Sequence, residues 1–184
     1  MDREPVIYTP RLELHHLNVA EIISLFERPE DPWIYEGKGF INPHRELIDE
    51  SGPLAWRVPQ VKIEPHLNKW FVRWMVLKER REIIGSTSFH GAPDENGMIE
   101  IGLGVSPKFR RQGFAYEALA GMWSWVCTQE GIETLRYTVA ASNKASIALV
   151  KKFGFIHIGQ QLDELDGPEE IFELSAEVFR KLSF

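Results

Sequence analysis

The hydrophobic and polar positions along the chain change their period several times, and each change predicts an element. Residues 9–15 alternate with a period of two, which predicts a strand. A helix follows, because Asn18 and Glu21 form a capping-box pattern and apolar residues then recur at helical spacing until Pro29. Six of the eleven prolines fall between residues 28 and 68, where the pattern decays, so we expect one or two short helices joined by loops.

The periodic pattern returns after residue 68. Three apolar runs rich in β-branched residues, at residues 70–77, 83–89 and 98–105, predict an antiparallel meander, and Asn96-Gly97 supplies the turn before the third run. Later patterns predict a helix over residues 112–129, a strand over 135–139, a helix over 143–152, and two short strands over 155–159 and 171–174. This order predicts an α+β, or mixed α/β, fold in a single domain over residues 1–184.

Composition limits the class of protein. With 43% hydrophobic and 26% charged residues among 184, the chain has enough apolar material for a core and no signature of disorder. The single cysteine, Cys127, excludes an internal disulfide and a multi-thiolate metal site, and its place beside Val126 predicts a buried apolar residue in the middle of a helix. The first residues lack the pattern of a secretory signal, and no apolar run reaches the roughly 18–20 residues of a bilayer span. We therefore expect a cytoplasmic protein without a membrane segment.

The net charge argues against nucleic acid as a partner. The chain has 21 Lys and Arg against 27 Asp and Glu, a formal net charge of −6, so it lacks the basic character that drives sequence-independent binding to phosphates. Any site for an anion must therefore be local. His15 and His16 have no partner at ligand spacing, and we expect no metal site.

One stretch, residues 100–115, runs from a predicted strand through a short basic loop into a predicted helix. Strand alternation places Glu100, Gly102 and Gly104 on one face of the strand. Because glycine has no side chain, this face exposes a track of backbone that begins beside one carboxylate, and a ligand can approach it closely. Beyond the track, two arginines and the free amides of a helix start would accept a pyrophosphate. Two alternatives stay open, because the glycines could mark a β-bulge and the basic residues an ordinary solvated turn. A Rossmann phosphate loop is excluded, since Pro107 stands where a third glycine is required.

These residues resemble the motifs of a known family. The loop Arg110-Arg111-Gln112-Gly113-Phe114-Ala115 resembles the (Gln/Arg)-x-x-Gly-x-(Gly/Ala) signature of the GNAT superfamily of acyl-CoA-dependent N-acyltransferases. Asn143-Lys144-Ala145-Ser146 followed by Gly154-Phe155 resembles the family's Asn-x-x-Ser…Gly-Phe segment. Residues 9–14 resemble the opening of the ribosomal-protein N-terminal acetyltransferases, the RimJ/RimL-like branch. The resemblance spans nearly the whole chain and is weakest between residues 28 and 68.

The resemblance implies a fold and a co-substrate. In this family a twisted, mostly antiparallel central sheet splays in the middle, helices cover both faces, and the pantetheine arm of acetyl-CoA lies in the gap. Carried over by motif, the pantetheine would contact Leu103, Gly104 and Val105, the pyrophosphate would contact residues 110–115, and Asn143 and Ser146 would contact the arm near its sulfur. The family often forms homodimers, and the resemblance implies no metal.

Acyl transfer to an amine needs groups that move protons and stabilise charge. Glu100 is the candidate general base, directly or through water, with a structural ion pair as its alternative role. A backbone N–H near Leu103 would stabilise the oxyanion. Many family members carry a tyrosine just before the Gly-Phe pair, where this chain has Phe153, so protonation of the thiolate would fall to Ser146 or a water, with Tyr137 a weaker option. A thiol pKa near 8.5 makes a strong acid dispensable.

The acceptor stays open at this point. The RimJ/RimL-like branch acetylates protein N-terminal amines or small-molecule amines, by direct transfer in a ternary complex, and fold does not decide between them. Four aromatic residues lie in the irregular region that borders the acceptor site in this family, so they would line the pocket or pack in the core: Trp33, Tyr35, Phe40 and Trp56. The alternative function is a non-catalytic acyl-CoA-binding or sensing module of the same fold, which the phenylalanine in place of the tyrosine favours.

Overall fold

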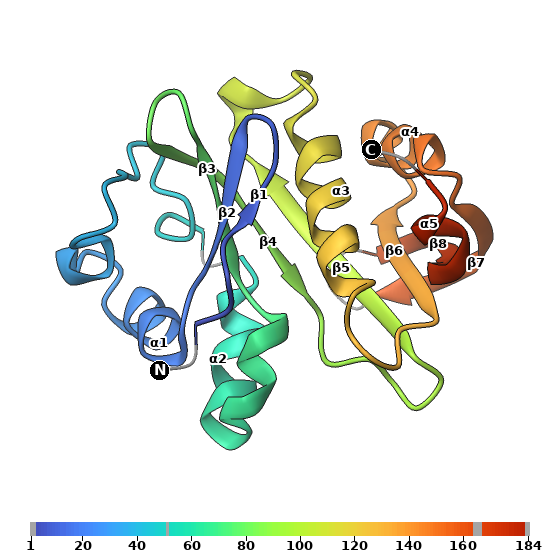
Figure 1. The fold of residues 1–184 in the computed structure, drawn as a ribbon, viewed down its shortest axis with the longest axis horizontal. Helices are drawn as coiled ribbons and strands as arrows, with labels where there is room; N and C mark the ends of the chain where they lie inside the picture. The colour runs from blue at the N-terminus through green and yellow to red at the C-terminus, as the bar shows by residue number, and fades with distance from the viewer. Residues whose placement is uncertain (1–2, 51, 164–166, 183–184) are drawn as a thin grey trace.

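The fold is built on one eight-stranded sheet. The computed structural model describes residues 3–50, 52–163 and 167–182, and in this part of the chain the strands lie in the order β1-β2-β3-β4-β5-β6-β8-β7 (Figure 1). The strands are β1 (Ile7–Tyr8), β2 (Leu12–His16), β3 (Arg73–Leu77), β4 (Glu82–Phe89), β5 (Met98–Val105), β6 (Thr134–Ala140), β7 (Ile156–Asp163) and β8 (Gly167–Ser175). Neighbours pair antiparallel except β5 and β6, which confirms the expected mixed, mostly antiparallel sheet.

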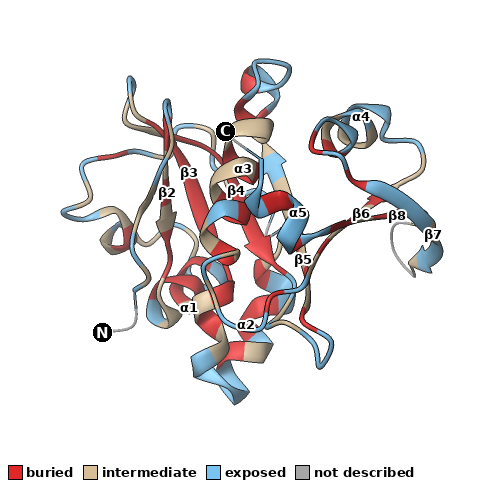
Figure 2. Cartoon of the chain, turned by 45° about the vertical axis from the view of Figure 1, so that its right-hand side comes forward, coloured by how far each residue is buried: buried red, intermediate tan, exposed pale blue. Residues whose placement is uncertain are grey.

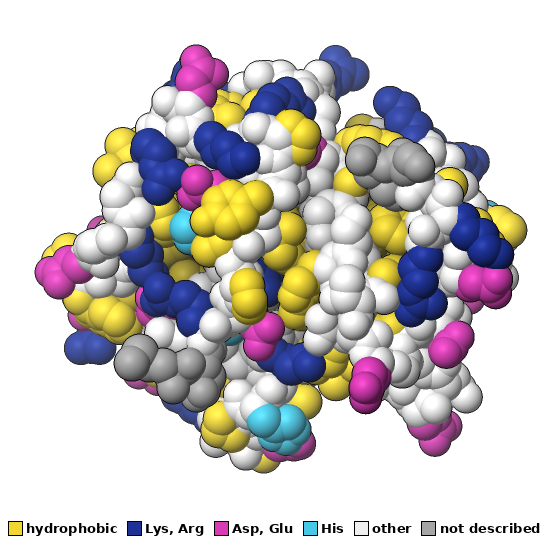
Figure 3. Space-filling model, viewed as in Figure 1, with side chains coloured by type: hydrophobic (Ala, Val, Ile, Leu, Met, Phe, Trp, Pro, Cys, Tyr) yellow, Lys and Arg dark blue, Asp and Glu magenta, His cyan; other side chains and the backbone are white. Residues whose placement is uncertain are grey.

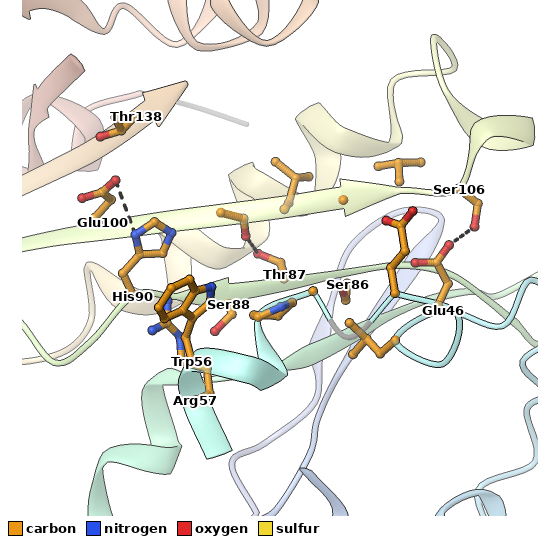
Figure 4. A pocket seen from close by; sticks show the side chains of 18 of the residues that line it. Glu46, Trp56, Arg57, Ser86, Thr87, Ser88, His90, Glu100, Ser106 and Thr138 are labelled. Atoms are coloured by element: carbon orange, nitrogen blue, oxygen red, sulfur yellow. Dashed lines mark hydrogen bonds and ion pairs between the residues drawn. The ribbon is translucent and has the colours of Figure 1, made fainter. Parts of the chain in front are cut away.

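The helices cover both faces of this sheet. They are α1 (Val19–Glu27), α2 (Leu54–Ile63), α3 (Phe114–Val126), α4 (Lys144–Lys152) and α5 (Ala176–Arg180), with 3-10 turns η1 (Pro32–Tyr35), η2 (Pro65–Trp70) and η3 (Pro107–Phe109). Helix α3 packs against β1, β2 and β5, and α2 lies across β4 and β5 from it (Figure 4). Buried residues concentrate where the helices meet strands β2 to β5 (Figure 2).

The sheet opens between β5 and β6. These strands run parallel and pair from Met98 opposite Thr134 to Glu100 opposite Arg136, and no pairing continues beyond that point. On its other edge β5 stays paired with β4 as far as Val105. The two strands therefore diverge toward the end at which α3 begins (Figure 1), and the last part of β5 keeps a backbone edge without a strand partner among the described residues.

The local signals for the first helix are confirmed. The Asn18 side chain accepts from the Glu21 backbone N–H at 3.0 Å, the Glu21 carboxylate accepts from the Asn18 N–H at 2.8 Å, and α1 ends at Glu27, just before Pro29. The proline-rich region contains α2 and two 3-10 turns, as expected. Helix α2 includes Pro59 in its interior, so that proline does not end a helix as the pattern would predict.

Several element boundaries differ from the prediction. The strand expected over residues 9–15 is β2 at Leu12–His16, with a separate β1 at Ile7–Tyr8, and the run at 70–77 is a strand only from Arg73. Helix α3 starts later and ends sooner than residues 112–129, because Gly113 is its N-cap with φ +84° and Cys127 is its C-cap. The interpretation of Cys127 as mid-helical is therefore wrong, and its side chain is half-buried. Strands β7 and β8 extend well beyond the two predicted short strands and pair antiparallel, with a register shift between His157 and Gly159. Most of β7 is exposed, so no hydrophobic alternation marks its second half.

Candidate active site

A cavity of about 1020 Å³ lies against β4 and β5, on the side covered by α2. Its wall combines segments far apart in the sequence (Figure 4): Glu46, Trp56 and Arg57 from the proline-rich region, Ser86 to Ser88 and His90 from β4 and the residue after it, Glu100, Gly102, Leu103, Gly104 and Val105 from β5, Arg110 from the following loop, Thr138 from β6, and Gln161, Asp163 and Glu169 from the β7–β8 hairpin. The predicted track on β5 therefore forms one wall of a real cavity.

The open edge of β5 suits an extended ligand. Leu103, Gly104 and Val105 lie beyond the last β5–β6 pair, so no strand in the described part of the chain pairs with their backbone groups on that side. A Cβ on Gly104 would meet nothing within 4 Å, so the space above this backbone is open. An extended chain with amide groups can bond such an edge as an added strand. The residues present therefore fit the pantetheine arm.

The loop after β5 leads into a helix start with free amides. Gly113 is the N-cap of α3, and no side chain of the described residues caps that end. The exposed Arg111 takes a left-handed φ of 61°, and Arg110 donates from Nε to the Val105 carbonyl at 2.9 Å. First-turn N–H groups, a helix dipole and two arginines are the kind of groups that can hold an anion. The anion site at residues 110–115 stays a prediction, and the backbone geometry here is compatible with it.

A network that the sequence reasoning missed holds this helix start in place. Glu117 accepts from the Thr9 hydroxyl and the Arg11 backbone N–H, each at 2.6 Å, and from Arg11 Nε at 2.7 Å. Arg11 also donates to the Gln112 carbonyl at 3.0 Å and lies 4.2 Å from the centre of the Phe114 ring. Burial opposes ionisation, yet the hydrogen bonds from Thr9 and Arg11 lower the pKa of Glu117. The only available signal was the Thr-Pro-Arg segment, whose partner is distant in sequence.

Glu100 lies where the β5–β6 gap begins. Its side chain is 19% exposed, and Oε1 lies 3.4 Å from Nδ1 of His90. Arg57 on α2 contributes a further positive charge to this group. Glu100 therefore lies beside His90 and also lines the cavity, and the structural and catalytic roles predicted for it are not exclusive.

His90 is the residue of this site that sequence reasoning overlooked. It follows β4 directly, and its backbone N–H donates to the Glu100 carbonyl at 2.9 Å. Partial burial lowers the pKa of His90, Glu100 raises it and Arg57 lowers it, with a net lowering. Counting outward from Asn96-Gly97 as a two-residue turn would place Pro93 opposite Glu100, so the sequence alone could not identify His90 as its neighbour; the observed register pairs Phe89 with Ile101.

Arg57 is the second overlooked residue. It is 7% exposed, donates from Nη1 to the Gln60 side chain at 3.1 Å, and lies 5.4 Å from the centre of the Phe71 ring. Burial lowers the pKa of Arg57 to about 10, and Glu100 opposes that shift. The guanidinium remains charged at neutral pH and forms a fixed cation in the cavity wall.

The start of α4 lies outside this cavity. The Asn143 side chain accepts from the Ser146 backbone N–H at 3.1 Å and so caps the helix. A hydrogen bond joins the side chains of Ser146 and Tyr137, and burial raises the pKa of Tyr137. Phe153 stacks on Tyr116 with ring centres 4.2 Å apart. The residues proposed to protonate the thiolate are thus engaged with one another, apart from the Glu100 wall.

Trp33 and Tyr35 do not line the cavity. Trp33 donates from its indole N–H to the Ser24 hydroxyl at 2.9 Å, and Tyr35 stacks on Trp74 with ring centres 5.3 Å apart. Both rings belong to the packing of α1, η1 and β3, which corresponds to the core alternative. Trp56, 59% exposed on α2, is the aromatic residue that faces the cavity.

Several other features of the described residues bear on function. They contain no helix that is long and apolar enough to cross a bilayer, and no group of three or more His, Cys, Asp or Glu arranged to hold a metal ion. Burial raises the pKa of Cys127, which keeps its thiol protonated. Basic and acidic side chains are interspersed over the face shown in Figure 3.

Comparisons with known proteins identify the family. Residues 11–156 match the model of the acetyltransferase (GNAT) domain. The chain is 31% identical over 152 residues to the uncharacterized N-acetyltransferase YoaA of Bacillus subtilis (strain 168), an alignment that covers 82% of each protein. It is 34% identical over 98 residues to the uncharacterized N-acetyltransferase YjdG of the same organism, covering 53% of this chain and only 58% of YjdG.

A solved structure agrees with this family. RimL, a ribosomal α-N-protein acetyltransferase in complex with coenzyme A, superposes with a TM-score of 0.63 at 14% identity, over 93% of this chain and 98% of that one. At that identity the likeness concerns the fold. The chain belongs to the GNAT acetyltransferase family, and the predicted fold class is confirmed.

Proposed function

We propose that this protein transfers the acetyl group of acetyl-CoA to a primary amine by direct transfer in a ternary complex. One observation carries the proposal: the unpaired edge of β5 and the Glu100 carboxylate lie in the wall of the same cavity. A thioester whose arm follows that edge would end beside Glu100. The binding site for the activated acyl group would then lie next to a group that can accept a proton, as acyl transfer requires.

Each part of the site has a proposed role. The backbone of Leu103, Gly104 and Val105 would bond the pantetheine, and an N–H near Leu103 would stabilise the oxyanion. Residues 110–115 would hold the pyrophosphate at the start of α3. Asn143 and Ser146 would meet the arm from the start of α4. Acetyl-CoA, when bound, supplies an acetyl group activated as a thioester.

The amine must lose a proton, and the need for a base depends on the acceptor. A free α-amine with a pKa near 7.7–8.0 is roughly 10–20% neutral at pH 7, whereas a lysine with a pKa near 10.4 is about 0.04% neutral. The neighbouring side chains of Glu100 and His90 in the cavity wall offer an acceptor for that proton. The leaving thiolate needs only a weak acid, such as water or Ser146, because a thiol pKa lies near 8.5.

The acceptor class includes protein N-termini and small amines. The RimL structure supports the first, since that protein is named as a ribosomal α-N-protein acetyltransferase. The FsC-acetyl coenzyme A-N(2)-transacetylase of Aspergillus fumigatus, 26% identical over 173 residues, supports a small-molecule acceptor instead. Both acceptors present a primary amine, and that shared chemistry is what we propose.

The proposed function is tested by mixing the protein with acetyl-CoA and a panel of amines while free thiol is measured. The panel includes short peptides with free N-termini, the same peptides acetylated, free amino acids and diamines. We expect thiol release that depends on a free amine. Binding of acetyl-CoA without amine-dependent release across the panel would favour the sensing module instead.

A further inference from the structure

We propose that His90 is the catalytic residue that accepts the amine proton, at its Nε2 atom, and that Glu100 is a positioning residue that orients the imidazole. This inference rests on the proposed function and assigns the proton transfer within it. It differs from the role that the sequence alone gives to Glu100.

The two ring nitrogens of His90 face different groups. Nδ1 lies 3.4 Å from Glu100 Oε1. Nε2 points the other way along β5, since a Cβ built on Gly102 would lie 3.2 Å from it. The histidine thus bridges from the carboxylate to the bare backbone position just before Leu103, and Figure 4 shows the ring on the cavity side of β5.

The glycine at position 102 leaves the space that Nε2 of His90 occupies. Any side chain there would crowd the imidazole, and the next residues, Leu103 and Gly104, form the open edge on which the acyl arm would lie. The Thr87 hydroxyl donates to the Gly102 carbonyl at 2.9 Å and fixes that peptide. Nε2 therefore lies closer to the expected reaction centre than the carboxylate does.

The Glu100 carboxylate sets the tautomer of the ring. An ionised carboxylate only accepts hydrogen bonds, so it favours a proton on Nδ1 and leaves the lone pair on Nε2 free. The 3.4 Å separation is long for a hydrogen bond, as is common in ligand-free catalytic sites, where such contacts tighten when substrate binds. The same division of labour, an acid that orients and an imidazole that accepts, operates in hydrolytic triads.

Charged groups from two elements face the imidazole. Glu100 on β5 favours the protonated ring, whereas Arg57 on α2 disfavours it. Burial of the ring is the largest cause of the lowered pKa of His90, and the charge of Arg57, itself almost fully buried and poorly screened, adds to it, so the resting ring is neutral. Transfer of a proton to Nε2 then places the imidazolium between these opposite charges.

The step balances in atoms and electrons. The amine lone pair forms the bond to the acetyl carbon, and the carbon–sulfur bond breaks with its electron pair leaving on sulfur. The amine proton passes to Nε2 of His90 and from there, through water, to the thiolate. The products are the acetamide and a neutral thiol, and the imidazole returns to its starting state.

A measurement without substrates tests the geometry. In protein labelled with nitrogen-15 at histidine, NMR should show His90 neutral at pH 7.5 with its proton on Nδ1, the His90→Gln spectrum identifying the signal. Glu100→Gln should lower the pKa of His90 and raise the share of the Nε2–H tautomer. A wild-type ring protonated on Nε2, or a tautomer unchanged in Glu100→Gln, would overturn the proposal.

Kinetics distinguish His90 from Glu100. His90→Gln should reduce kcat at least about 100-fold, the lower end for general-base catalysis, with the Kd for CoA unchanged. The variant should also lose the decline of kcat/KM toward low pH that protonation of His90 imposes. The remaining pH dependence of kcat/KM should follow protonation of the amine substrate alone. Glu100→Gln should keep the His90 decline and shift it to lower pH with the ring's pKa.

The chain contains a matched control. His157 on β7 pairs with Glu170 on β8, and its side chain is 46% exposed, against 48% for His90. His157→Gln should leave kcat unchanged, since that pair does not line the cavity.

If Glu100→Gln removes the low-pH decline and His90→Gln retains it, Glu100 is the base and the inference fails while the proposed function survives. If wild-type protein releases no thiol with any amine, the proposed function fails, and the NMR result still decides the geometry.

Discussion

The candidate site has two parts, here called its phosphate end at residues 110–115, of which only Arg110 lines the cavity, and its Glu100 end, and the two are built differently. The end that would hold the phosphates is one continuous stretch of chain, in which backbone amides and exposed arginines point outward around Gly113. The end around Glu100 is assembled from side chains of α2, β4 and β5, with Arg57 buried in the wall. Charges at the first end are solvated and screened by salt, whereas those at the second act in a lower effective dielectric.

This difference separates binding from chemistry. A ligand with several negative charges is held well by free N–H groups and solvated cations, which need no exact spacing. Moving a single proton instead requires groups whose charges are balanced and whose positions are fixed. The first end should therefore control affinity for CoA, and the second should control the rate and the amine.

The largest expected effect comes from filling the β5 edge. Gly104→Val adds a side chain where nothing lies within 4 Å, so the fold accommodates it while the ligand loses its space. We expect the Kd for CoA to rise about 10–100-fold, the equivalent of overpacking by 1–3 kcal/mol. Calorimetric titration measures the Kd, and denaturant unfolding checks that stability is retained.

A neighbouring glycine gives the contrast. A Cβ on Gly85 would lie 2.3 Å from the Gly104 carbonyl oxygen, so Gly85→Ala should destabilise the fold itself. A wild-type Kd for CoA in Gly104→Val would show that the pantetheine arm does not follow β5. The proposed separation of CoA binding at one end from proton transfer at the other would then be wrong.

The next effect concerns the support of the phosphate end. Glu117→Gln weakens the charge-assisted bonds to Thr9 and Arg11, which should lower the free energy of unfolding by about 1–3 kcal/mol at pH 7. The folded-state pKa of Glu117 is lowered, so its contribution is present above the unfolded pKa of about 4.3 and is lost as pH falls through the folded pKa. The difference between variant and wild type should therefore shrink in acid.

Denaturant unfolding at pH 7 and in acid measures this difference. Glu177→Gln is the control, because Glu177 pairs with Lys181 on the exposed surface of α5 and should contribute nothing measurable. Equal losses in the two variants would mean that the Thr9–Arg11–Glu117 network adds no specific support to α3.

The two ends also differ in how far the sequence predicts them. The strand and the helix start of the phosphate end were predictable because they follow one another within residues 100–115, and local rules apply to each. The same reasoning could not find Arg57, since its helix contains Pro59 and lies in a region without hydrophobic periodicity. His90 became visible only through the register of β4 against β5.

The aromatic residues show the same limit. Trp33 and Trp56 occur in the same proline-rich region, and nothing in their neighbours distinguishes a core ring from a cavity ring. Three-dimensional packing decides which ring lies in the core and which lines the cavity, because η1 folds onto α1 while α2 crosses β4 and β5. The antiparallel meander of β3, β4 and β5 was predictable from turns and alternation, whereas the place of β8 between β6 and β7, and the cavity, depend on contacts between segments far apart in sequence.

A smaller effect is expected from the arginines of the phosphate end. Arg110→Ala and Arg111→Ala should each raise the Kd for CoA about 2–5-fold, the range of an exposed ion pair worth up to about 1 kcal/mol. Because both side chains are exposed, the effect should fall as salt rises to 1 M. CoA titrations at low and high salt measure it, and a salt-independent loss would place the charges in a desolvated site instead.

The smallest effect tests the acceptor end. Trp56 is 59% exposed and faces the cavity, so Trp56→Ala should raise the KM for the amine by a few-fold, about 1 kcal/mol of apolar contact or less. The Kd for CoA and the free energy of unfolding should stay unchanged. Steady-state kinetics with the best amine of the panel measure the KM.

Trp33→Ala separates a cavity ring from a core ring. It removes an indole that packs on the core and donates to Ser24, so it should destabilise the fold without a specific change in the KM for the amine. The opposite pattern is a raised KM for the amine in Trp33→Ala and an unchanged KM in Trp56→Ala. That result would mean that the acceptor binds on the η1 side and not at the α2 wall. The base at His90 would then be too distant from the amine, so this pair of substitutions also tests whether the two halves of the proposed mechanism share one cavity.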